Sequence, residues 1–186
     1  MPGKMIVICA PSGTGKSTLI SRLKDDHPEL QWSVSCTTRP MRAGETNGKD
    51  YHFISKEEFE KQIQDNQFIE WAKVHSNYYG TSKIFVDQGL LDGQEMLFDL
   101  DVQGADAMKK IYGSEAQVIF IEPPSIEELE KRLRVRGTDA DHVITERIKN
   151  ARRELERKKD FDYLILNDEV NKAYTSLKAA VERILK

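Results

Sequence analysis

The stretch Ala10-Pro-Ser-Gly-Thr-Gly-Lys-Ser17 decides the fold of this chain. It follows an apolar run, Met5 to Ala10, and leads into a segment of helical character from Lys16 to Leu23. A strand, a glycine-rich turn and a helix in this order provide the context that a phosphate-binding loop requires. The usual pattern is G-x-x-x-x-G-K-S/T, and Ala10 replaces its first glycine here. We still expect the stretch to bind a nucleoside triphosphate.

Each residue type in this loop suits phosphate chemistry. Gly13 and Gly15 have no Cβ, so the backbone can curl and direct its N–H groups inward. Lys16 supplies a point charge for the outer phosphates, and Ser17 supplies a hydroxyl suited to Mg²⁺. A glycine turn that binds nothing is the alternative, and the intact Gly15-Lys16-Ser17 behind an apolar strand argues against it. The expected triphosphate contacts in the loop are Ala10, Pro11, Ser12, Gly13, Thr14, Gly15, Lys16, Ser17 and Thr18.

The composition is that of a globular protein of one domain, with 186 residues of which 39% are hydrophobic and 32% charged. A formal net charge of −3 gives no reason to expect a nucleic-acid partner, and the basic run at residues 152–159 is interpreted as a solvated surface. No signal-peptide core or membrane-length apolar run is visible, so we expect a cytoplasmic protein without a membrane partner. Cys9 and Cys36 lack metal-binding spacing and are expected to be reduced.

Residues 35–81 are expected to form a small, mostly β insertion. An expected strand, Gln31 to Thr37, leads into a long loop at residues 38–50 that carries arginine, proline and glycine residues. Long loops in compact domains are often functional. The remaining elements expected here are strands at residues 51–54, 68–74 and 77–80, and a helix to residue 65 that starts with the capping box Ser55-Lys-Glu-Glu58.

The second half of the chain alternates apolar strands with amphipathic helices. This order predicts an α/β fold in which helices cover both faces of a parallel sheet. Such sheets bind ligands at the carboxyl ends of their strands, where the glycine-rich loop, Asp99, Asp101 and Asn167 all fall. The expected strands are residues 95–101, 117–121 and 163–166, and the expected helices are residues 103–111, a helix from the capping box Ser125-Ile-Glu-Glu128, a helix with the apolar stripe Ile144, Ile148, Ala151 and Leu155, and a closing helix to Leu185.

The stretch from Ser35 to Tyr51, SCTTRPMRAGETNGKDY, closely resembles the signature of guanylate kinases. The resemblance covers nearly the whole chain and continues through residues 78–81, 99–104, 132–138 and 167–168. It implies a fold of three parts: a phosphate-loop core, a GMP-binding insertion and a mobile helical lid. The expected bounds are residues 1–34, 82–127 and 160–186 for the core, 35–81 for the insertion and 128–159 for the lid.

The resemblance implies that Arg39, Arg42, Tyr51 and Tyr79 hold the phosphate of GMP. Two guanidinium groups and two phenol hydroxyls suit a dianion with several oxygens. Arginines on a solvated loop and tyrosines packed in a core are the ordinary alternatives. Their occurrence together on one insertion, in a chain with a phosphate loop, favours the binding role.

Ser35 and Glu70 match the residues with which the family reads guanine. A carboxylate accepts hydrogen bonds from N1–H and the exocyclic amine of guanine, and a hydroxyl can donate to O6. Adenine has the opposite pattern at positions 1 and 6, so it would leave a buried carboxylate unpaired. Thr81 stands where the family usually has a small hydroxyl residue and is expected to support them. An exposed charge on a strand is the alternative for Glu70.

Two aspartates, Asp99 and Asp101, end an apolar strand on the side of the phosphate loop. The resemblance implies that both face the reacting groups, where they contact GMP or the water ligands of Mg²⁺. Which of them acts on Mg²⁺ stays open at this point.

The lid and hinge arginines of the family match Arg132, Arg136 and Arg147, which flank Gly137-Thr138. Hinged closure would bring them onto the transferred phosphoryl group, and a basic helix surface is the alternative. Asn167 matches the family's contact to the adenine of ATP.

The resemblance implies phosphoryl transfer from MgATP to GMP, giving ADP and GDP, with dGMP as a further acceptor. A non-enzymatic binding module is one rival, but such modules typically have damaged phosphate loops. A kinase for a phosphorylated sugar is another, and the presence of Ser35 and Glu70 argues against it. The residues expected to act in catalysis are Lys16, Arg39, Arg136 and Arg147.

Overall fold

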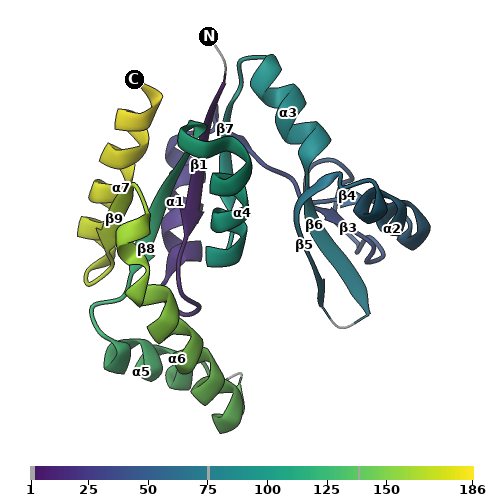
Figure 1. Ribbon diagram of the computed structural model, residues 1–186. Coiled ribbons are helices and arrows are strands. Elements are labelled where there is room, and N and C mark those ends of the chain that lie inside the picture. The colour runs from purple at the N-terminus through teal and green to yellow at the C-terminus, as the bar shows by residue number, and fades with distance from the viewer. Residues whose placement is uncertain (1–2, 75, 138) are drawn as a thin grey trace. The chain divides into compact units, whose positions relative to one another are not determined.

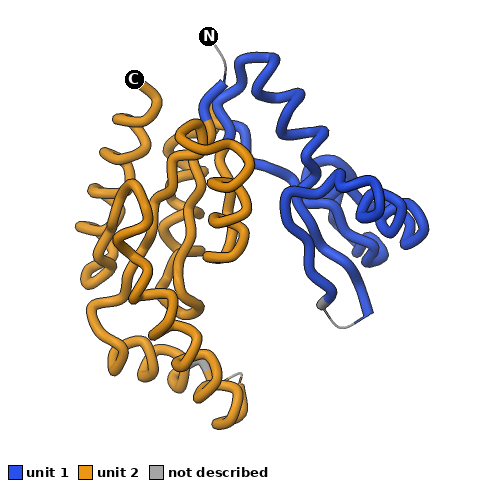
Figure 2. Tube along the Cα trace, viewed as in Figure 1, with its two compact units in different colours: residues 1–4, 31–96 blue, residues 5–30, 97–186 orange. Residues whose placement is uncertain are grey.

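The computed structural model describes residues 3–74, 76–137 and 139–186. Its contacts divide the chain into two compact units, which Figure 2 draws in different colours. Unit 1 comprises Met1–Lys4 and Gln31–Met96, and unit 2 comprises Met5–Leu30 and Leu97–Lys186. Each unit is described below by itself.

A five-stranded sheet has the order β2-β7-β1-β8-β9. β1 pairs with β8, and β8 with β9, in parallel register, as the alternation of strands and helices predicts. Met5 to Cys9 of β1 are completely buried, which explains the unbroken apolar run before the glycine-rich loop. The strands are β1 (Lys4–Cys9), β2 (Gln31–Trp32), β7 (Glu95–Asp99), β8 (Ala116–Glu122) and β9 (Tyr163–Leu166).

Helices cover both faces of this sheet, so the predicted α/β fold is confirmed (Figure 1). α1 contacts α7, and α4 packs against β8. The predicted inward residues of α7, Leu177, Val181 and Ile184, are buried. The helices of unit 2 are α1 (Lys16–Asp26), α4 (Val102–Tyr112), α5 (Ile126–Arg136), α6 (Asp141–Glu156) and α7 (Val170–Leu185), with two short 3₁₀ helices, η1 (Gly113–Glu115) and η2 (Lys158–Asp160).

The helices α5 and α6 share an apolar cluster of their own. Leu129 and Leu133 of α5 are completely buried, and they pack with Ile144, Ile148 and Ala151 of α6. Three of the four residues predicted for the apolar stripe of α6 are therefore buried, whereas the fourth, Leu155, is only partly buried.

Unit 1 contains a four-stranded sheet in the order β4-β3-β6-β5. β3 and β4 are parallel, while β3–β6 and β5–β6 are antiparallel. Phe59 of α2 stacks on Phe68 with ring centroids 4.2 Å apart and forms a small core with Cys36. The elements are β3 (Cys36–Thr37), β4 (His52–Phe53), α2 (Lys56–Gln64), β5 (Phe68–Val74), β6 (Asn77–Ser82) and α3 (Lys83–Leu91).

Two local predictions are wrong, and one helix is not predicted at all. The expected single strand from Gln31 to Thr37 is two short strands, β2 and β3, which belong to different sheets. The strand β7 ends at Asp99, and Asp101 is the N-cap of α4 instead. α3 was not expected, because its apolar residues follow no clear helical period and Ile84 and Phe85 are half exposed.

Both cysteines are free and buried. Burial raises the pKa of the Cys9 thiol to about 12 and that of the Cys36 thiol to about 11, so both remain protonated and unreactive at neutral pH. Among the described residues, no helix combines the length and the apolar character needed to span a bilayer.

The serine caps of both predicted capping boxes are present at the starts of α2 and α5, and the one at Ser125 leads to a stability prediction. The Ser125 Oγ accepts a hydrogen bond of 3.1 Å from the Glu128 N–H at the start of α5, as Ser55 does from Glu58 at the start of α2. We expect Ser125→Ala to lower the free energy of unfolding by about 1 kcal/mol, because one N–H of the first turn loses its acceptor. Urea unfolding followed by circular dichroism measures this change.

Two matched variants make that measurement specific. Ser125→Asp keeps an acceptor and should retain the wild-type stability. Ser176→Ala, at an exposed position inside α7, should change stability by less than about 0.5 kcal/mol. Equal losses for Ser125→Ala and Ser176→Ala would contradict the capping role.

Candidate active site

The glycine-rich loop connects β1 to α1 and has no room for side chains at two positions. Gly13 and Gly15 have φ angles of 90° and 97°, in the region that favours glycine. A Cβ on Gly13 would lie 2.7 Å from Leu133 Cδ2, and one on Gly15 would lie 2.6 Å from Asn167 Nδ2. Both glycines are therefore required by backbone conformation and by close packing.

A cavity of about 640 Å³ lies against this loop. The start of α1 contributes backbone N–H groups without intrahelical partners, which makes the position suitable for an anion. The walls of the cavity are formed by the loop residues Ala10, Pro11, Ser12, Gly13, Thr14, Gly15, Lys16, Ser17 and Thr18, and by Asp101, Gln103, Arg132, Arg147, Asn150 and Glu154. All the residues expected in the loop thus line one cavity.

Lys16 is held by two oxygen acceptors at the end of β7. Its Nζ lies 2.7 Å from Asp99 Oδ1 and also donates to the carbonyl oxygen of Leu100. Asp101 has a different partner, since its Oδ1 accepts a hydrogen bond of 2.8 Å from the Gly104 N–H. The two aspartates therefore differ in position: Asp99 is paired with Lys16, and Asp101 caps α4 and lines the cavity.

Asn167 and Arg132 hold the backbone of the loop from the other side. Asn167 is 3% exposed, and its Nδ2 donates a hydrogen bond of 2.7 Å to the Thr14 carbonyl. Arg132 Nη1 donates to the carbonyls of Thr14 and Asn167, both at 3.3 Å, and its Nε donates to Glu128. Both residues thus act on the shape of the loop in addition to any contact with a nucleotide.

The helix α6 brings Arg147 to the loop. Its Nη1 donates a hydrogen bond of 3.2 Å to Ser12 Oγ and lies 3.4 Å from Asp139 Oδ2. Gly137, with a φ of 64°, ends α5 ahead of α6. The side chain of Arg136 and all of Thr138 lie outside the described part of the chain.

In unit 1, two of the expected phosphate ligands, Arg39 and Arg42, contact the carboxylate of Glu45, which the sequence did not single out. Arg39 donates two hydrogen bonds to Glu45, of 3.0 and 2.7 Å, and the Arg42 N–H donates a third of 2.7 Å. The Arg39 guanidinium and the Arg42 N–H lower the pKa of Glu45 to about 2. The Glu45 carboxylate thus accepts three hydrogen bonds, and its position shows where the donors of Arg39 and Arg42 can bind an anion.

Tyr51 and Tyr79 lie beside this arginine. The guanidinium of Arg39 is 5.4 Å from the ring centroid of Tyr51, and the rings of Tyr51 and Tyr79 meet edge to face at 6.0 Å. The structure therefore brings Arg39, Tyr51 and Tyr79 together, whereas the side chain of Arg42 is exposed on the loop.

Two of the expected base-reading residues, Glu70 and Thr81, lie side by side in the sheet of unit 1. Thr81, 1% exposed, donates a hydrogen bond of 2.6 Å to Glu70 Oε1, and the two residues are register partners between β5 and β6. Ser35 directly precedes β3, whose Cys36 pairs with Gly80 of β6, and its carbonyl accepts a hydrogen bond of 2.9 Å from the His52 N–H. A carboxylate and a hydroxyl on adjacent strands offer acceptors and donors to a planar base.

Some cavity residues were missed by the sequence reasoning, namely Gln103, Asn150 and Glu154. The two residues of α6 could have been found from the sequence, because residues 150 and 154 share a helical face with Arg147, which was predicted to act at the site. Most of the basic run at residues 152–159 is exposed, as expected, and its end also forms ion pairs: Arg157 donates two hydrogen bonds to Asp106, and Lys158 lies 2.7 Å from Glu122.

Comparison with known proteins gives a consistent result. The family model for guanylate kinase matches residues 2–184. A guanylate kinase of Idiomarina loihiensis is 48% identical over 181 residues, covering 96% of this chain and 86% of that protein. One of Lawsonia intracellularis is 49% identical, covering 95% of this chain and 83% of that protein.

A solved structure agrees with both relatives. The crystal structure of guanylate kinase from Anaplasma phagocytophilum is 31% identical, with a TM-score of 0.68, and the match covers 98% of this chain and 86% of that chain. Sequence and structure thus match along nearly the whole length, and the chain belongs to the guanylate kinase family.

Proposed function

We propose the residues through which this chain, a guanylate kinase, transfers a phosphoryl group from ATP to GMP and forms ADP and GDP. The observation that carries the assignment is the loop cavity, where helix-start amides, Lys16 and Arg147 converge. We assign the triphosphate of ATP to this cavity. Lys16 contacts its outer phosphates, while Arg132 and Arg147, with Arg136 of the same lid, stabilise the charge of the transferred group.

The cavity also suits a hydrated Mg²⁺, which prefers oxygen ligands and keeps several of its waters. The exposed hydroxyl of Ser17 and the carboxylate of Asp101 line the same cavity. We assign Ser17 as the direct ligand and Asp101 as an acceptor for the bound waters. When bound, the ion neutralises charge on the β- and γ-phosphates. Asp99 is assigned to positioning Lys16, with which it is paired.

The phosphate of GMP is assigned to Arg39, Arg42, Tyr51 and Tyr79. Glu45 offers two oxygens to the two terminal nitrogens of the Arg39 guanidinium in this structure. A phosphate can offer two oxygens in the same way, so it can replace the carboxylate without leaving the arginine unpaired. Once displaced, the Glu45 carboxylate can accept hydrogen bonds from solvent.

The guanine base is assigned to Ser35, Glu70 and Thr81. Because Thr81 holds one oxygen of Glu70, the carboxylate is oriented before the base arrives. The assigned contacts engage base and phosphate but not the 2′-hydroxyl, so we expect dGMP to be accepted too. Asn167 remains the proposed contact to the adenine of ATP. Free cysteines fit the reducing cytoplasm, the proposed location.

The phosphate of GMP is already a nucleophile at neutral pH, so the reaction needs no covalent enzyme intermediate. The protein must align two polyanions, stabilise the charge that spreads over the transferred group and exclude water. The proposed lid, residues 128–159, supplies arginines and excludes water when it closes, and Gly137 is the proposed hinge. We also propose residues 1–34, 82–127 and 160–186 as the core and residues 35–81 as the GMP-binding insertion.

We expect Lys16→Ala to lower kcat by at least about 10²-fold, because it removes a preorganised charge from the phosphoryl group. A coupled assay of ADP release with MgATP and GMP measures this loss. The thermal melting temperature should stay near the wild-type value, since Lys16 and its partner Asp99 are both solvent-accessible.

Lys172→Ala is the matched control for Lys16→Ala. Lys172 is an exposed lysine of α7 that pairs only with Glu169 among the described interactions. It should retain full activity. Near-normal turnover by Lys16→Ala would remove this lysine from the mechanism.

We expect Glu70→Gln to reduce the preference for GMP over AMP in kcat/KM by about 10- to 100-fold, the amount that hydrogen bonds to a charged group contribute. The amide keeps the size of the side chain but replaces one acceptor by a donor, so it no longer matches N1–H and the exocyclic amine. The same ADP-release assay with GMP, AMP, CMP and UMP gives the ratios.

Glu57→Gln, at an exposed position in the first turn of α2, serves as the control and should leave the ratios unchanged. Unaltered discrimination in Glu70→Gln would show that another residue reads the base. A wild-type protein that binds ATP but is inactive with all four nucleotides would contradict the assignment of the GMP site.

A further inference from the structure

The carboxylate of Glu154 lies in the wall of the phosphate-loop cavity, where negative charge is unexpected beside a triphosphate. It stands on α6 in helical register with Arg147 and Asn150, which line the same cavity. Ala151 of the same helix is buried in the cluster with α5. The position of Glu154 is therefore set by the packing of α6 and not by a free loop.

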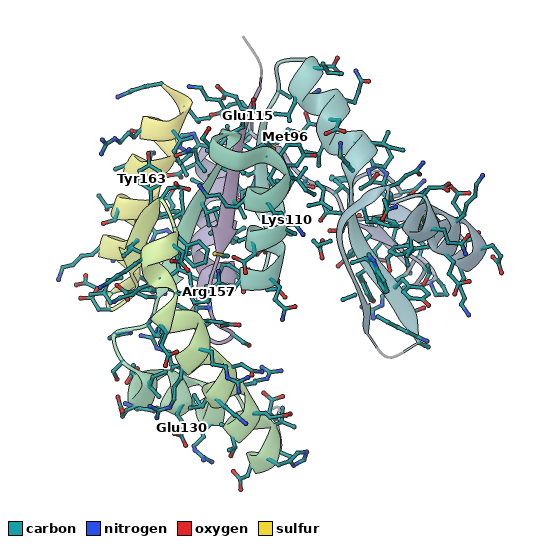
Figure 3. The ribbon with its side chains drawn as sticks, viewed as in Figure 1. Met96, Lys110, Glu115, Glu130, Arg157 and Tyr163 are labelled. Carbon is teal, nitrogen blue, oxygen red and sulfur yellow. The ribbon has the colours of Figure 1, made fainter. Side chains whose placement is uncertain are left out.

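A second contact fixes this end of α6. Arg157, three residues after Glu154 and labelled in Figure 3, donates hydrogen bonds of 2.6 and 2.8 Å to the two carboxylate oxygens of Asp106 on α4. The first turn of α4 begins at its N-cap, Asp101. The bidentate ion pair thus holds Glu154 close to the helix whose start carries Asp101.

Glu154 and Asp101 influence each other electrostatically. Burial raises the pKa of the Glu154 carboxyl, the negative charge of Asp101 raises it further, and the ammonium of Lys16 opposes both. Two carboxylates that repel each other beside phosphate oxygens are unfavourable unless a cation lies near both. Lys16 is one such cation, and it is already paired with Asp99.

We propose that Glu154 is a positioning residue which, together with Asp101, accepts hydrogen bonds from the water ligands of the Mg²⁺ that accompanies ATP. This inference rests on the proposed function, which assigns MgATP to the cavity. Mg²⁺ retains several waters, so carboxylates beyond its direct ligands orient it through them. Arg147 lies on the same face of α6, so this face would provide both an acceptor for the metal-bound waters and a cation for the phosphates.

The test compares binding of β,γ-imido-ATP with and without metal by isothermal titration calorimetry, once in excess Mg²⁺ and once in EDTA. We expect Glu154→Gln to reduce the Mg²⁺-dependent gain in affinity by about tenfold, the lower end of the range for residues that orient metal ligands. Affinity in EDTA should stay equal or rise, because one negative charge beside the phosphates is removed. A merely structural residue would lower both affinities together.

Glu156→Gln is the matched control, because Glu156 is exposed two residues further along α6 and does not line the cavity. It should keep the wild-type ratio of affinities. A wild-type ratio in Glu154→Gln would overturn the proposal, as would an equal loss in both conditions with a lowered melting temperature. Wild-type protein that binds no β,γ-imido-ATP would instead contradict the assignment of ATP to this cavity.

Discussion

The carbonyl of Thr14 is the point on which the phosphate loop depends. It accepts hydrogen bonds from the buried amide of Asn167 and from Arg132, so segments that follow β9 and β8 fix the turn that follows β1. The close approach of Leu133 to Gly13 and of Asn167 to Gly15 removes any space for a Cβ. A loop that binds phosphate by its backbone must be rigid, because reorganisation of amides would cost binding energy. The shape of the loop therefore depends on α5 and on the segment that follows β9.

The cations of the proposed sites are held by carboxylates within their own unit. Lys16 is paired with Asp99, and Arg39 with Glu45. This arrangement positions each cation and limits unfavourable repulsion among the many basic groups that phosphate binding requires. At Arg39, it also gives the proposed phosphate of GMP a defined competitor, Glu45, so that binding exchanges one anion for another. Exchange of this kind favours ligands that present several oxygens in a plane or fork, since a single oxygen would replace only part of the contact.

The helix α6 combines structural and chemical roles on two faces. One face buries Ile144, Ile148 and Ala151 against α5, and the other presents Arg147 to the cavity. Helical geometry links the two faces rigidly, so a change in packing between α5 and α6 moves the charged groups as well. The last turn is tied to α4 through Arg157. In the proposed lid, Arg147 therefore stands on a packed element, which defines its position better than a loop would.

The sequence by itself determined the α/β architecture, the serine caps of α2 and α5, most of the apolar stripe of α6 and the family, because these follow from local spacing and from contiguous motifs. It did not separate β2 from β3 or detect α3, since the first depends on which sheet each short strand joins and the second has no clear period. Only the tertiary structure decided the partners of side chains distant in sequence. It paired Asp99 with Lys16, gave Asp101 to the cap of α4 and placed Glu154 in the cavity, because contacts of this kind arise from how separate elements pack.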